Sequence, residues 1–254
     1  MVLFIAIVII LRRTDRLNAQ RLKEKERLER ELLQQEKLAG MGRMVAGVAH
    51  EIRNPLGIIC SSAELVLKKA RKEESSYVRI LEALFAESKR LSRTVSDFLD
   101  YARPKKPRQD RVDIAQVLDQ AVVFLETESA KRGIAVEQDY THGLEVLGDK
   151  DLLYRALYNI ISNALQAMDA GEGRLAIHAE ARGEDILLTI TDTGPGFDPE
   201  HMDNYLDPFF TTKEMGTGLG LAIVSSIIEG HGARMTLANA EGGGARVDMV
   251  FKAA

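Results

Sequence analysis

The sequence predicts an α+β protein in which a helical hairpin, completed by a second copy into a dimeric four-helix bundle, precedes a two-layer α/β sandwich. Between residues 38 and 102, apolar residues recur at alternating steps of three and four, the spacing of helices packed side by side. After residue 105, segments of alternating apolar and polar residues mix with helical ones, as in a sheet covered by helices. The length of 254 residues, with 45% hydrophobic and 28% charged residues, fits one or two ordinary globular domains.

The composition excludes several classes of function. A formal net charge of -4 leaves no general basic field, and the absence of tryptophan with only 6% aromatic residues argues against stacking of bases. We therefore expect no nucleic-acid partner. The single cysteine, Cys60, excludes an intramolecular disulfide and a cysteine-based zinc site.

The first 37 residues predict a membrane connection. Residues 1–11 are all apolar and are followed at once by Arg12 and Arg13. A helix of that length covers only about 16 Å, roughly half of a bilayer core, so we expect the cytoplasmic end of a truncated transmembrane helix with a positive-inside flank. The alternative is a short interfacial or buried segment. Residues 12–37, rich in helix formers, predict a coiled-coil connector, with a solvated charged helix as the alternative.

Residues 38–104 predict the hairpin. The polar segment 68–76 is expected to connect its helices, and Pro104 and Pro107 to end the second one. Two such helices bury too little surface alone, which favours a dimer. The expected seam positions are Leu38, Met41, Val45, Val48, Ile52, Pro55, Ile59, Ser62 and Val66 in the first helix, and Leu81, Leu84, Ser88, Leu91, Val95, Phe98 and Ala102 in the second.

His50 is expected on the outer face of the first helix. At about 100° per residue it lies roughly 200° from Val48, nearly opposite the seam. Asn54 follows one turn later on that face, and Glu51 is the adjacent residue. A single exposed histidine is usually an idle surface residue, so its significance depends on its neighbours.

Residues 105–254 contain the elements of a nucleotide site. Asn159 and Asn163 are four residues apart on a helix expected over about 150–168, so their amides share one face and suit a magnesium ion and phosphates. The segment DTGPG at 192–196 ends an expected strand, where a carboxylate can accept from the adenine amine beside closely approaching glycine backbone. GTGLGLAIV at 216–224 is a glycine loop opening a helix, which suits phosphate binding.

Each of these signals is weak alone, but their order carries a resemblance. GVAHEIRNPLG at 47–57 resembles the phosphoacceptor box of the sensor histidine kinases of two-component systems. NIISNALQAM, DTGPG, DPFFTTK and GTGLGLAIV resemble the N, G1, F and G2 boxes of their ATP-binding domain, whose fold is shared with gyrase, Hsp90 and MutL. The resemblance extends from residue 38 to about 251. The segment FFTTKEMGTGLGLAIV, residues 209–224, is most similar to the nitrogen-regulation branch of this family.

The resemblance implies a role for each residue of the phosphoacceptor box. His50 would be the nucleophile, because a neutral imidazole can attack a phosphoryl group. Glu51 would hold the other ring N–H, and Asn54 would orient a water toward a phosphorylated partner.

In the ATP-binding domain, Asn163 would bind Mg²⁺ and Asn159 would help to hold the phosphates. Asp192 would recognise adenine, with Gly194 and Gly196 shaping the pocket. Residues 198–215 would form a lid, in which Lys213 would meet the γ-phosphate of ATP. The loop around the phosphates would consist of Gly216, Thr217, Gly218, Leu219 and Gly220.

The resemblance therefore implies a membrane-anchored homodimeric kinase, with residues 12–254 on the cytoplasmic side of the inner membrane. It would phosphorylate His50 from ATP with Mg²⁺ and pass the phosphoryl group to an aspartate of a response regulator. The alternatives are an enzyme that acts mainly as a phosphatase of the regulator through Asn54, and a non-catalytic dimeric scaffold that binds ATP as a switch.

Overall fold

The computed structural model divides the protein into two compact units, which meet between Phe85 and Ala86 in the chain. His50, Glu51 and the expected membrane segment 1–11 lie outside the described residues. The structure describes residues 25, 52, 54–73, 75–168, 173–213 and 216–254.

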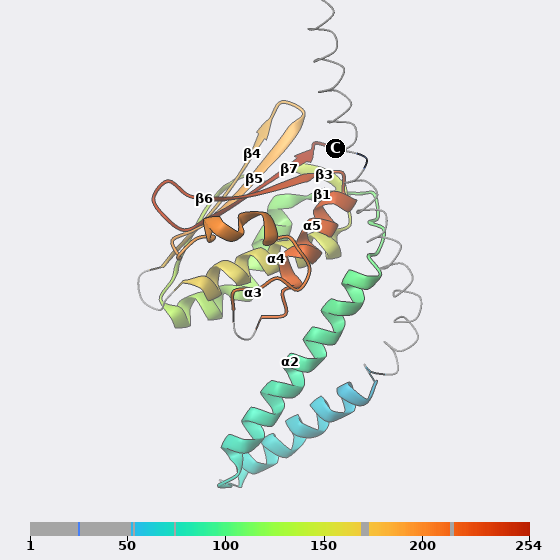
Figure 1. The fold of residues 1–254 in the computed structure, drawn as a ribbon, viewed down its shortest axis with the longest axis vertical. Helices are drawn as coiled ribbons and strands as arrows, with labels where there is room; N and C mark the ends of the chain where they lie inside the picture. The colour runs from blue at the N-terminus through green and yellow to red at the C-terminus, as the bar shows by residue number, and fades with distance from the viewer. Residues whose placement is uncertain (1–24, 26–51, 53, 74, 169–172, 214–215) are drawn as a thin grey trace, which may run out of the picture. The chain divides into compact units, whose positions relative to one another are not determined.

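The described part of the first unit is a helical hairpin, whose second helix continues beyond Phe85 into the second unit. One helix runs over residues 54–72, and the second, α2 (Val78–Ala102), begins after a turn in which Ser75 N–H donates to Ala70 O at 2.9 Å (Figure 1). The expectation that 68–76 connects the helices is wrong for 68–72, which are helical. Lysine, alanine and arginine favour the helix there, and Lys68 pairs with Glu64 across one turn at 2.9 Å.

The packing of this hairpin corrects the predicted seam. Leu67 and Ala70 are buried, whereas Ile59 and Val66, which were expected to pack, are 52% and 50% exposed. In the first helix, the contact within one chain therefore uses positions one residue beyond the predicted ones. In the second helix, the predicted positions Ser88 and Ala102 are buried. An apolar stripe remains on the surface of the unit, and it includes Ile52, Ile59, Val66, Ile80 and Leu84.

Helix α2 ends where the prolines predict. Its last residue, Ala102, is buried, and the chain leaves the helix before Pro104. Proline lacks the backbone N–H that a helix interior requires, so the extended segment 103–109 follows.

The second unit contains a five-stranded sheet in the order β2-β4-β5-β7-β6, in which only the β2–β4 pair is parallel. A separate antiparallel pair, β1–β3, is joined to the chain end by the bridge Val146–Ala253. The strands are β1 (Asp110–Asp113), β2 (Ala135–Tyr140), β3 (Glu145–Gly148), β4 (Arg174–Arg182), β5 (Asp185–Asp192), β6 (Arg234–Asn239) and β7 (Ala245–Lys252).

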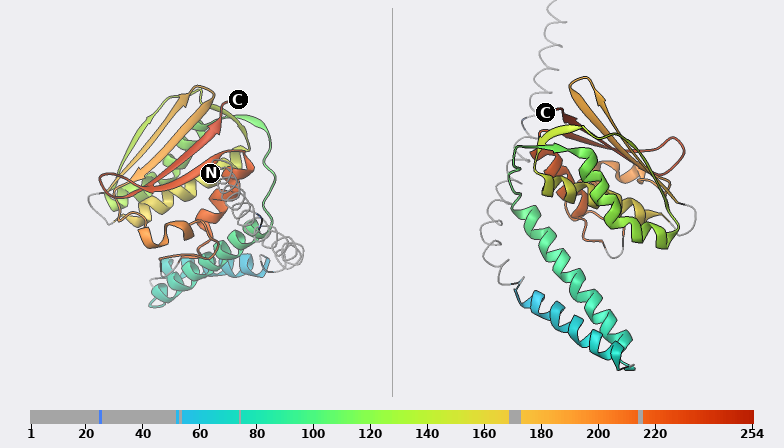
Figure 2. Two further views of the ribbon diagram at one scale, coloured as in Figure 1. Left: turned by 45° about the horizontal axis from the view of Figure 1, so that its top comes forward. Right: turned by 180° about the vertical axis from the view of Figure 1, so that it is seen from behind.

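Helices α3 (Ile114–Arg132), α4 (Lys150–Ala167) and α5 (Gly220–Gly230) cover one face of this sheet, as the two sides of the unit in Figure 2 show. Strand β5 alternates strictly: Ile186, Leu188 and Ile190 are buried between half-buried neighbours. This buried face packs on α4 and the other helices to form one core. The expected two-layer α/β sandwich is confirmed.

Among the described residues, no helix is long and apolar enough to cross a membrane.

Candidate nucleotide site

Asp192 is the last residue of β5 and lies on the buried face of this strand. Its side chain therefore points toward the helices, and the residue is only 5% exposed. Oδ1 accepts the backbone N–H of Gly194 at 2.8 Å and that of Ala245 at 3.0 Å. The two amides compensate the burial of the carboxylate, because a buried charge without such partners would be strongly unfavourable.

Two glycines allow the chain to turn tightly after Asp192. A Cβ at Gly194 would lie 3.1 Å from Asp192 Oδ1 and 3.3 Å from Ala167 O at the end of α4. Gly196 has a φ of +78°, and a side chain there would meet Asn239 Oδ1 at 2.7 Å. The glycines thus bring this loop against α4 and β6.

Asn239 clamps the same loop, although nothing in the sequence motif singled it out. Its side chain accepts the N–H of Phe197 at 2.7 Å and donates to the carbonyl of Phe197 at 2.8 Å. The side chain thus mimics a paired strand at the end of β6. The one indication in the sequence is the position of Asn239, which ends a short strand just before the Gly242–Gly244 turn.

Helix α4 presents Asn159 and Asn163, both half-buried, from one face. It begins at a strong N-cap, because Asp149 accepts the backbone N–H groups of Asp151 and Leu152 at 3.1 and 3.3 Å. Burial alone would raise the pKa of Asp149. The backbone N–H groups of Leu152, Arg108 and Asp151 and the Arg108 guanidinium outweigh it, so the pKa of this carboxyl is lowered.

His231 ties the start of α4 to the end of α5. Its Nε2 accepts the backbone N–H of Asp149 at 2.9 Å, and its Nδ1 lies 2.7 Å from the carbonyl of Ile227. The first bond needs a lone pair on Nε2, and the second needs a proton on Nδ1, so the ring is assigned as neutral. The sequence alone does not indicate this contact, because its two residues lie 82 positions apart.

The glycine loop leads into α5 without a side-chain cap. Leu219 occupies the N-cap position and makes no side-chain hydrogen bond to the helix, so the first N–H groups of α5 are suited to an anion. Gly218 has a φ of +66°, and a Cβ there would overlap the backbone of Phe209. A Cβ at Gly220 would lie 3.7 Å from Asn163 Nδ2, so the start of α5 faces the asparagine of α4.

Lys213 also reaches this helix face. Its Nζ lies 3.5 Å from Asn163 Oδ1 and 3.4 Å from Gln166 Oε1. Burial, together with the positive charge of Arg132, lowers the pKa of Lys213. A cation at this position, beside Asn163 and the glycine loop, suits a phosphate chain.

The segment expected to form the lid contains a short 3₁₀ helix, Pro199–Asn204, held by aromatic contacts. The ring of Tyr205 lies 4.8 Å from that of Phe197 and 5.4 Å from that of Phe210. The Tyr205 hydroxyl also accepts the backbone N–H of Asp198 at 3.0 Å. Residues 214 and 215 lie outside the described part of this segment.

The residues fit a nucleotide with a hard divalent cation. Asn163 offers an amide oxygen, which Mg²⁺ accepts when phosphates and water complete its coordination. Within the described residues there is no cluster of three or more histidine, cysteine, aspartate or glutamate side chains that could hold a metal by itself. The donor set therefore suits a cation that arrives with its phosphates.

Of the three phosphoacceptor-box residues predicted to act in catalysis, the structure describes only Asn54. His50 and Glu51 lie outside the described residues, while Asn54 is exposed on the helix 54–72 of the first unit. Asn163, Lys213 and the loop of Gly216, Gly218 and Gly220 converge in the second unit, with Asp192 on the adjacent strand end.

Two family models match the chain in the order that the motifs predict. Residues 41–107 match the His Kinase A (phospho-acceptor) domain, and residues 148–254 match the histidine kinase-, DNA gyrase B-, and HSP90-like ATPase. The sensor histidine kinase ZraS of Escherichia coli K12 is 33% identical over 224 residues, which cover 88% of this chain. The chain belongs to the sensor histidine kinases.

Further relatives of this sensor histidine kinase include the nitrogen regulation protein NtrY of Azorhizobium caulinodans, 31% identical over 234 residues and 88% of this chain. That similarity agrees with the nitrogen-regulation-like branch expected from the lid and glycine loop. The chain spans about half of the length of ZraS, 48% of it, and 30% of NtrY.

Solved structures of histidine kinases share the fold. A mycobacterial sensor histidine kinase, MprB, is 30% identical with a TM-score of 0.51, and the match covers 57% of this chain and 97% of MprB. Full-length ShkA in complex with AMPPNP is 26% identical with a TM-score of 0.70, over 84% of this chain and 46% of ShkA. ThkA in complex with the response regulator TrrA is 26% identical with a TM-score of 0.62, over 86% of this chain and 64% of that one.

Proposed function

We propose that this sensor histidine kinase transfers the γ-phosphoryl group of ATP to His50 and then to an aspartate of a response regulator. The convergence of Asn163, Lys213 and the uncapped start of α5 carries this proposal, because these groups together suit a triphosphate. The phosphoacceptor box at 47–57 supplies the nucleophile. The structure of ShkA with the ATP analogue AMPPNP supports nucleotide use by a protein of this fold.

Asp192 is the residue that we assign to adenine. Both of its described amide hydrogen bonds end on Oδ1, so Oδ2 is the oxygen assigned to the exocyclic amine of the base. Because two backbone amides fix the carboxylate, it does not have to reorganise when the base binds. Gly194 and Gly196 keep side chains out of the way of the ring.

At the phosphates, Asn163 and Asn159 would hold Mg²⁺ and phosphate oxygens, with Lys213 beside Asn163 and the amides of residues 216–220 at the start of α5. When bound, Mg²⁺ would neutralise the charge that develops on the phosphate oxygens during transfer. Gly218 and Gly220 let the backbone approach the phosphates closely, and the dipole of α5 favours the negative charge.

The transfer to His50 is a displacement at phosphorus. A neutral ring nitrogen of His50 forms the N–P bond while the bond from the γ-phosphorus to the bridging oxygen breaks and ADP leaves. Glu51 accepts the N–H of the other ring nitrogen and stabilises the positive charge on the imidazole. The phosphoryl group then passes to the carboxylate of the regulator.

The partners and the domain organisation belong to this proposal. ThkA is described in complex with a response regulator, which supports a regulator as the partner of this chain. The exposed apolar stripe of the hairpin supports a homodimer. We assign residues 1–11 to a membrane helix, 12–37 to a connector, 38–104 to dimerisation and phosphotransfer, and 105–254 to ATP binding. This places the chain at the inner membrane, with residues 12–254 in the cytoplasm.

Asn54 supports a second activity at the same histidine. It is exposed on the helix 54–72, four residues after His50, and would orient a water toward the phosphorylated aspartate of the regulator. The enzyme would then both phosphorylate and dephosphorylate its partner. Loss of dephosphorylation alone in Asn54→Ala is the result that this assignment requires.

Incubation of the chain with γ-labelled ATP and Mg²⁺ tests the kinase assignment. We expect acid-labile, alkali-stable label on the native chain and none on His50→Gln. His142→Gln is the matched control, because His142 is an exposed histidine outside the phosphoacceptor box, and it should label normally. Label retained on His50→Gln would move the acceptor elsewhere. Nucleotide binding without any label on the native chain would favour the scaffold alternative.

A further inference from the structure

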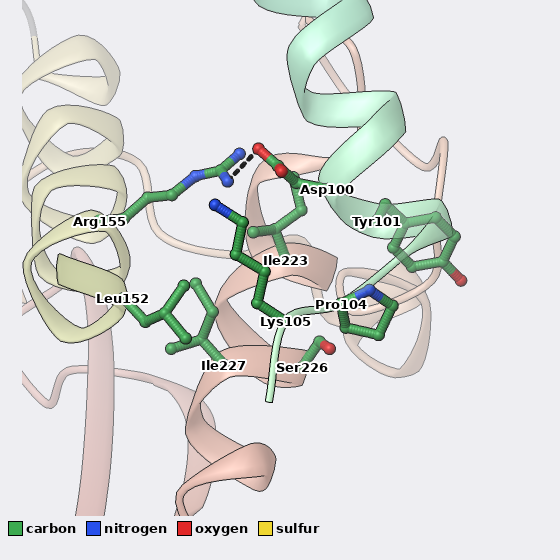
Figure 3. A pocket seen from close by; sticks show the side chains of 9 residues that line it. All are labelled: Asp100, Tyr101, Pro104, Lys105, Leu152, Arg155, Ile223, Ser226 and Ile227. Carbon is green, nitrogen blue, oxygen red and sulfur yellow. Dashed lines mark hydrogen bonds and ion pairs between the residues drawn. The ribbon is translucent and has the colours of Figure 1, made fainter. Parts of the chain in front are cut away.

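Arg155 of α4 meets two carboxylates from the last turns of α2. Its Nη2 lies 3.0 Å from Asp97 Oδ1, and its Nη1 donates to Asp100 Oδ2. All three residues belong to the unit Ala86–Ala254. Figure 3 shows the guanidinium of Arg155 reaching from α4 to Asp100 on α2. Neither the phosphoacceptor box nor the nucleotide site uses this cluster.

The cluster is more than a surface ion pair. The side chains of Arg155, Asp97 and Asp100 are only 27%, 21% and 26% exposed. Asp97 and Asp100 are three residues apart and so share one face of α2. A planar guanidinium presents N–H groups to both at once, which the single ammonium of lysine does less well. Removing the arginine would leave two half-buried carboxylates without their common cation.

The ion pairs lie beside the beginning of the linker, which we define as residues 103–109 between α2 and β1. A cavity of about 30 Å³ lies beneath them, with room for about one water and far too little for a nucleotide. Pro104 and Lys105 of the linker line it together with Leu152, Ile223 and Ile227 (Figure 3). Arg155 therefore attaches α4 to α2 at the place where the chain passes from the hairpin to the ATP-binding domain.

A second contact joins the same end of α2 to the glycine loop. The ring of Phe209 lies 6.4 Å from that of Phe98 and 6.5 Å from that of Tyr101. Phe209 also donates its N–H to Gly218 O at 2.9 Å and has a φ of +68°, a strained conformation for a residue other than glycine. The last turns of α2 thus hold both α4 and the segment that contacts the phosphate loop.

The proposed reaction requires this attachment to open. His50 must first meet the γ-phosphate and later the aspartate of a regulator, and the two cannot occupy the histidine together. The ATP-binding domain must therefore change its position relative to the hairpin during each cycle. Residues 103–109 are the covalent connection that permits this movement. The two carboxylates that bind Arg155 lie on α2 within one or two turns before this connection.

We propose that Arg155, with Asp97 and Asp100, is an electrostatic latch that holds the ATP-binding domain in a resting arrangement on α2. The inference rests on the proposed kinase function and adds a positioning residue to it. Releasing the latch frees the domain to reach His50, so autophosphorylation becomes faster while the nucleotide site itself is unchanged. Arg155 lies two turns before Asn163 on α4, so it acts through the position of the helix rather than by touching phosphate.

Arg155→Gln tests the latch with two independent measurements. The first is the rate of trypsin cleavage after Lys105. The side chain of Lys105 is exposed, but the backbone around it must leave its place beside Leu152 and Ile227 to enter the protease, so the rate reports the opened state without any phosphoryl transfer. The second is the rate of His50 labelling at saturating ATP, with the dissociation constant of an ATP analogue measured beside it. We expect both rates to rise by roughly five- to thirty-fold, with the dissociation constant unchanged.

Three further variants serve as controls. Arg111→Gln removes an exposed ion pair with Glu145 elsewhere in the same unit and should change neither rate. The charge exchange Arg155→Glu with Asp100→Arg restores one ion pair, so it should return both rates toward the native values. Asp100→Asn should act in the same direction as Arg155→Gln even if the arginine variant folds poorly.

The outcomes separate the latch from the proposed function. Unchanged trypsin cleavage in Arg155→Gln and Asp100→Asn would overturn the latch. Faster cleavage with slower labelling and unchanged nucleotide affinity would also overturn it, because the contact would then belong to the arrangement that phosphorylates His50. Absence of label on every chain, the native one included, would reject the kinase function, and trypsin cleavage would still report whether Arg155 restrains the domain.

Discussion

Single polar residues determine how the nucleotide site is built, and Asp192 is the clearest of them. It lies at the end of β5 on the same face of the strand as Ile186, Leu188 and Ile190. Because that face is buried, the carboxylate of Asp192 also points inward. The amides of Gly194 and Ala245 then stabilise the charge. The carboxylate that we assign to adenine is thereby fixed by secondary structure and backbone hydrogen bonds.

Asp149 acts at the same scale on helix α4. It caps the helix that carries Asn159 and Asn163, so Asp149→Ala should destabilise the protein by about 1 to 2 kcal/mol and lower its Tm by about 2 to 8 °C at neutral pH. Asp151→Ala is the matched control, because that neighbouring carboxylate is 85% exposed and should have a small effect. Calorimetry of the two variants measures the difference, and equal Tm values would show that the cap contributes nothing.

The pH dependence of this effect follows from the lowered pKa of Asp149. A carboxyl whose pKa is lower in the folded state stabilises the fold above its ordinary pKa, and that contribution disappears as the pH falls through the lowered value. The difference in Tm between the native chain and Asp149→Ala should therefore persist at neutral pH and shrink in strong acid. A difference that grows with acidification would contradict the assigned direction.

At the scale of elements, the sequence predicts those that have a strong local pattern. The alternation in 174–180, 185–191 and 245–251 leads to β4, β5 and β7, and the amphipathic run from Lys150 leads to α4. Strands β1 and β3 have four residues each, too few for alternation to be recognised, and their pairing joins residues more than thirty positions apart.

The contacts between elements could not be predicted in this way. The DTGPG and GTGLG motifs identify Asp192 and the glycine loop because local geometry requires those residues. Arg155, Asn239 and His231 act through partners 55, 42 and 82 positions away, and their local sequence has no distinctive pattern. Likewise, the apolar spacing of the hairpin predicts its two helices, but it does not show which face of the first helix packs within one chain. Leu67 is buried there, whereas the predicted Val66 is exposed.

The contact between α2 and α4 makes its own prediction about stability. Burial raises the pKa of Asp97, and Asp100 adds to this, although Arg155 lowers it. A carboxyl whose pKa is raised in the folded state stabilises the fold below its ordinary pKa, and that contribution is lost as the pH rises through the raised value. Asp97→Asn should therefore raise the Tm at pH 7, on the order of 2 °C, and leave it nearly unchanged at pH 3.

Asp139→Asn is the control for this prediction, because Asp139 is an 87% exposed aspartate paired with His178 on the sheet. Its Tm should stay close to the native value at both pH values. A lower Tm for Asp97→Asn at neutral pH would mean that the ion pair with Arg155 outweighs the burial of the carboxyl. Asp97 would then stabilise the latch as much as Asp100 does.

At the scale of the whole molecule, the hairpin cannot cover its own apolar surface. Leu67 and Ala70 are buried within one chain, but Ile59 and Val66 remain about half exposed, and Ile80 on α2 is 59% exposed. A contiguous apolar stripe of this kind on two helices usually marks an interface. A second copy of the same hairpin fits it, because antiparallel helical pairs form four-helix bundles with the apolar faces inside.

Val66→Glu places a charge in this stripe and should convert the dimer into a monomer, since an unpaired carboxylate cannot be buried between helices without a large penalty. Light scattering after size exclusion measures the mass directly. Lys68→Glu adds the same side chain on a 70% exposed position, about 200° around the helix from Val66, and should remain dimeric. A dimer that persists in Val66→Glu would place the interface on another face. Because the sequence places His50 on the same predicted helix, we would then also expect a different arrangement of the two phosphoacceptor histidines.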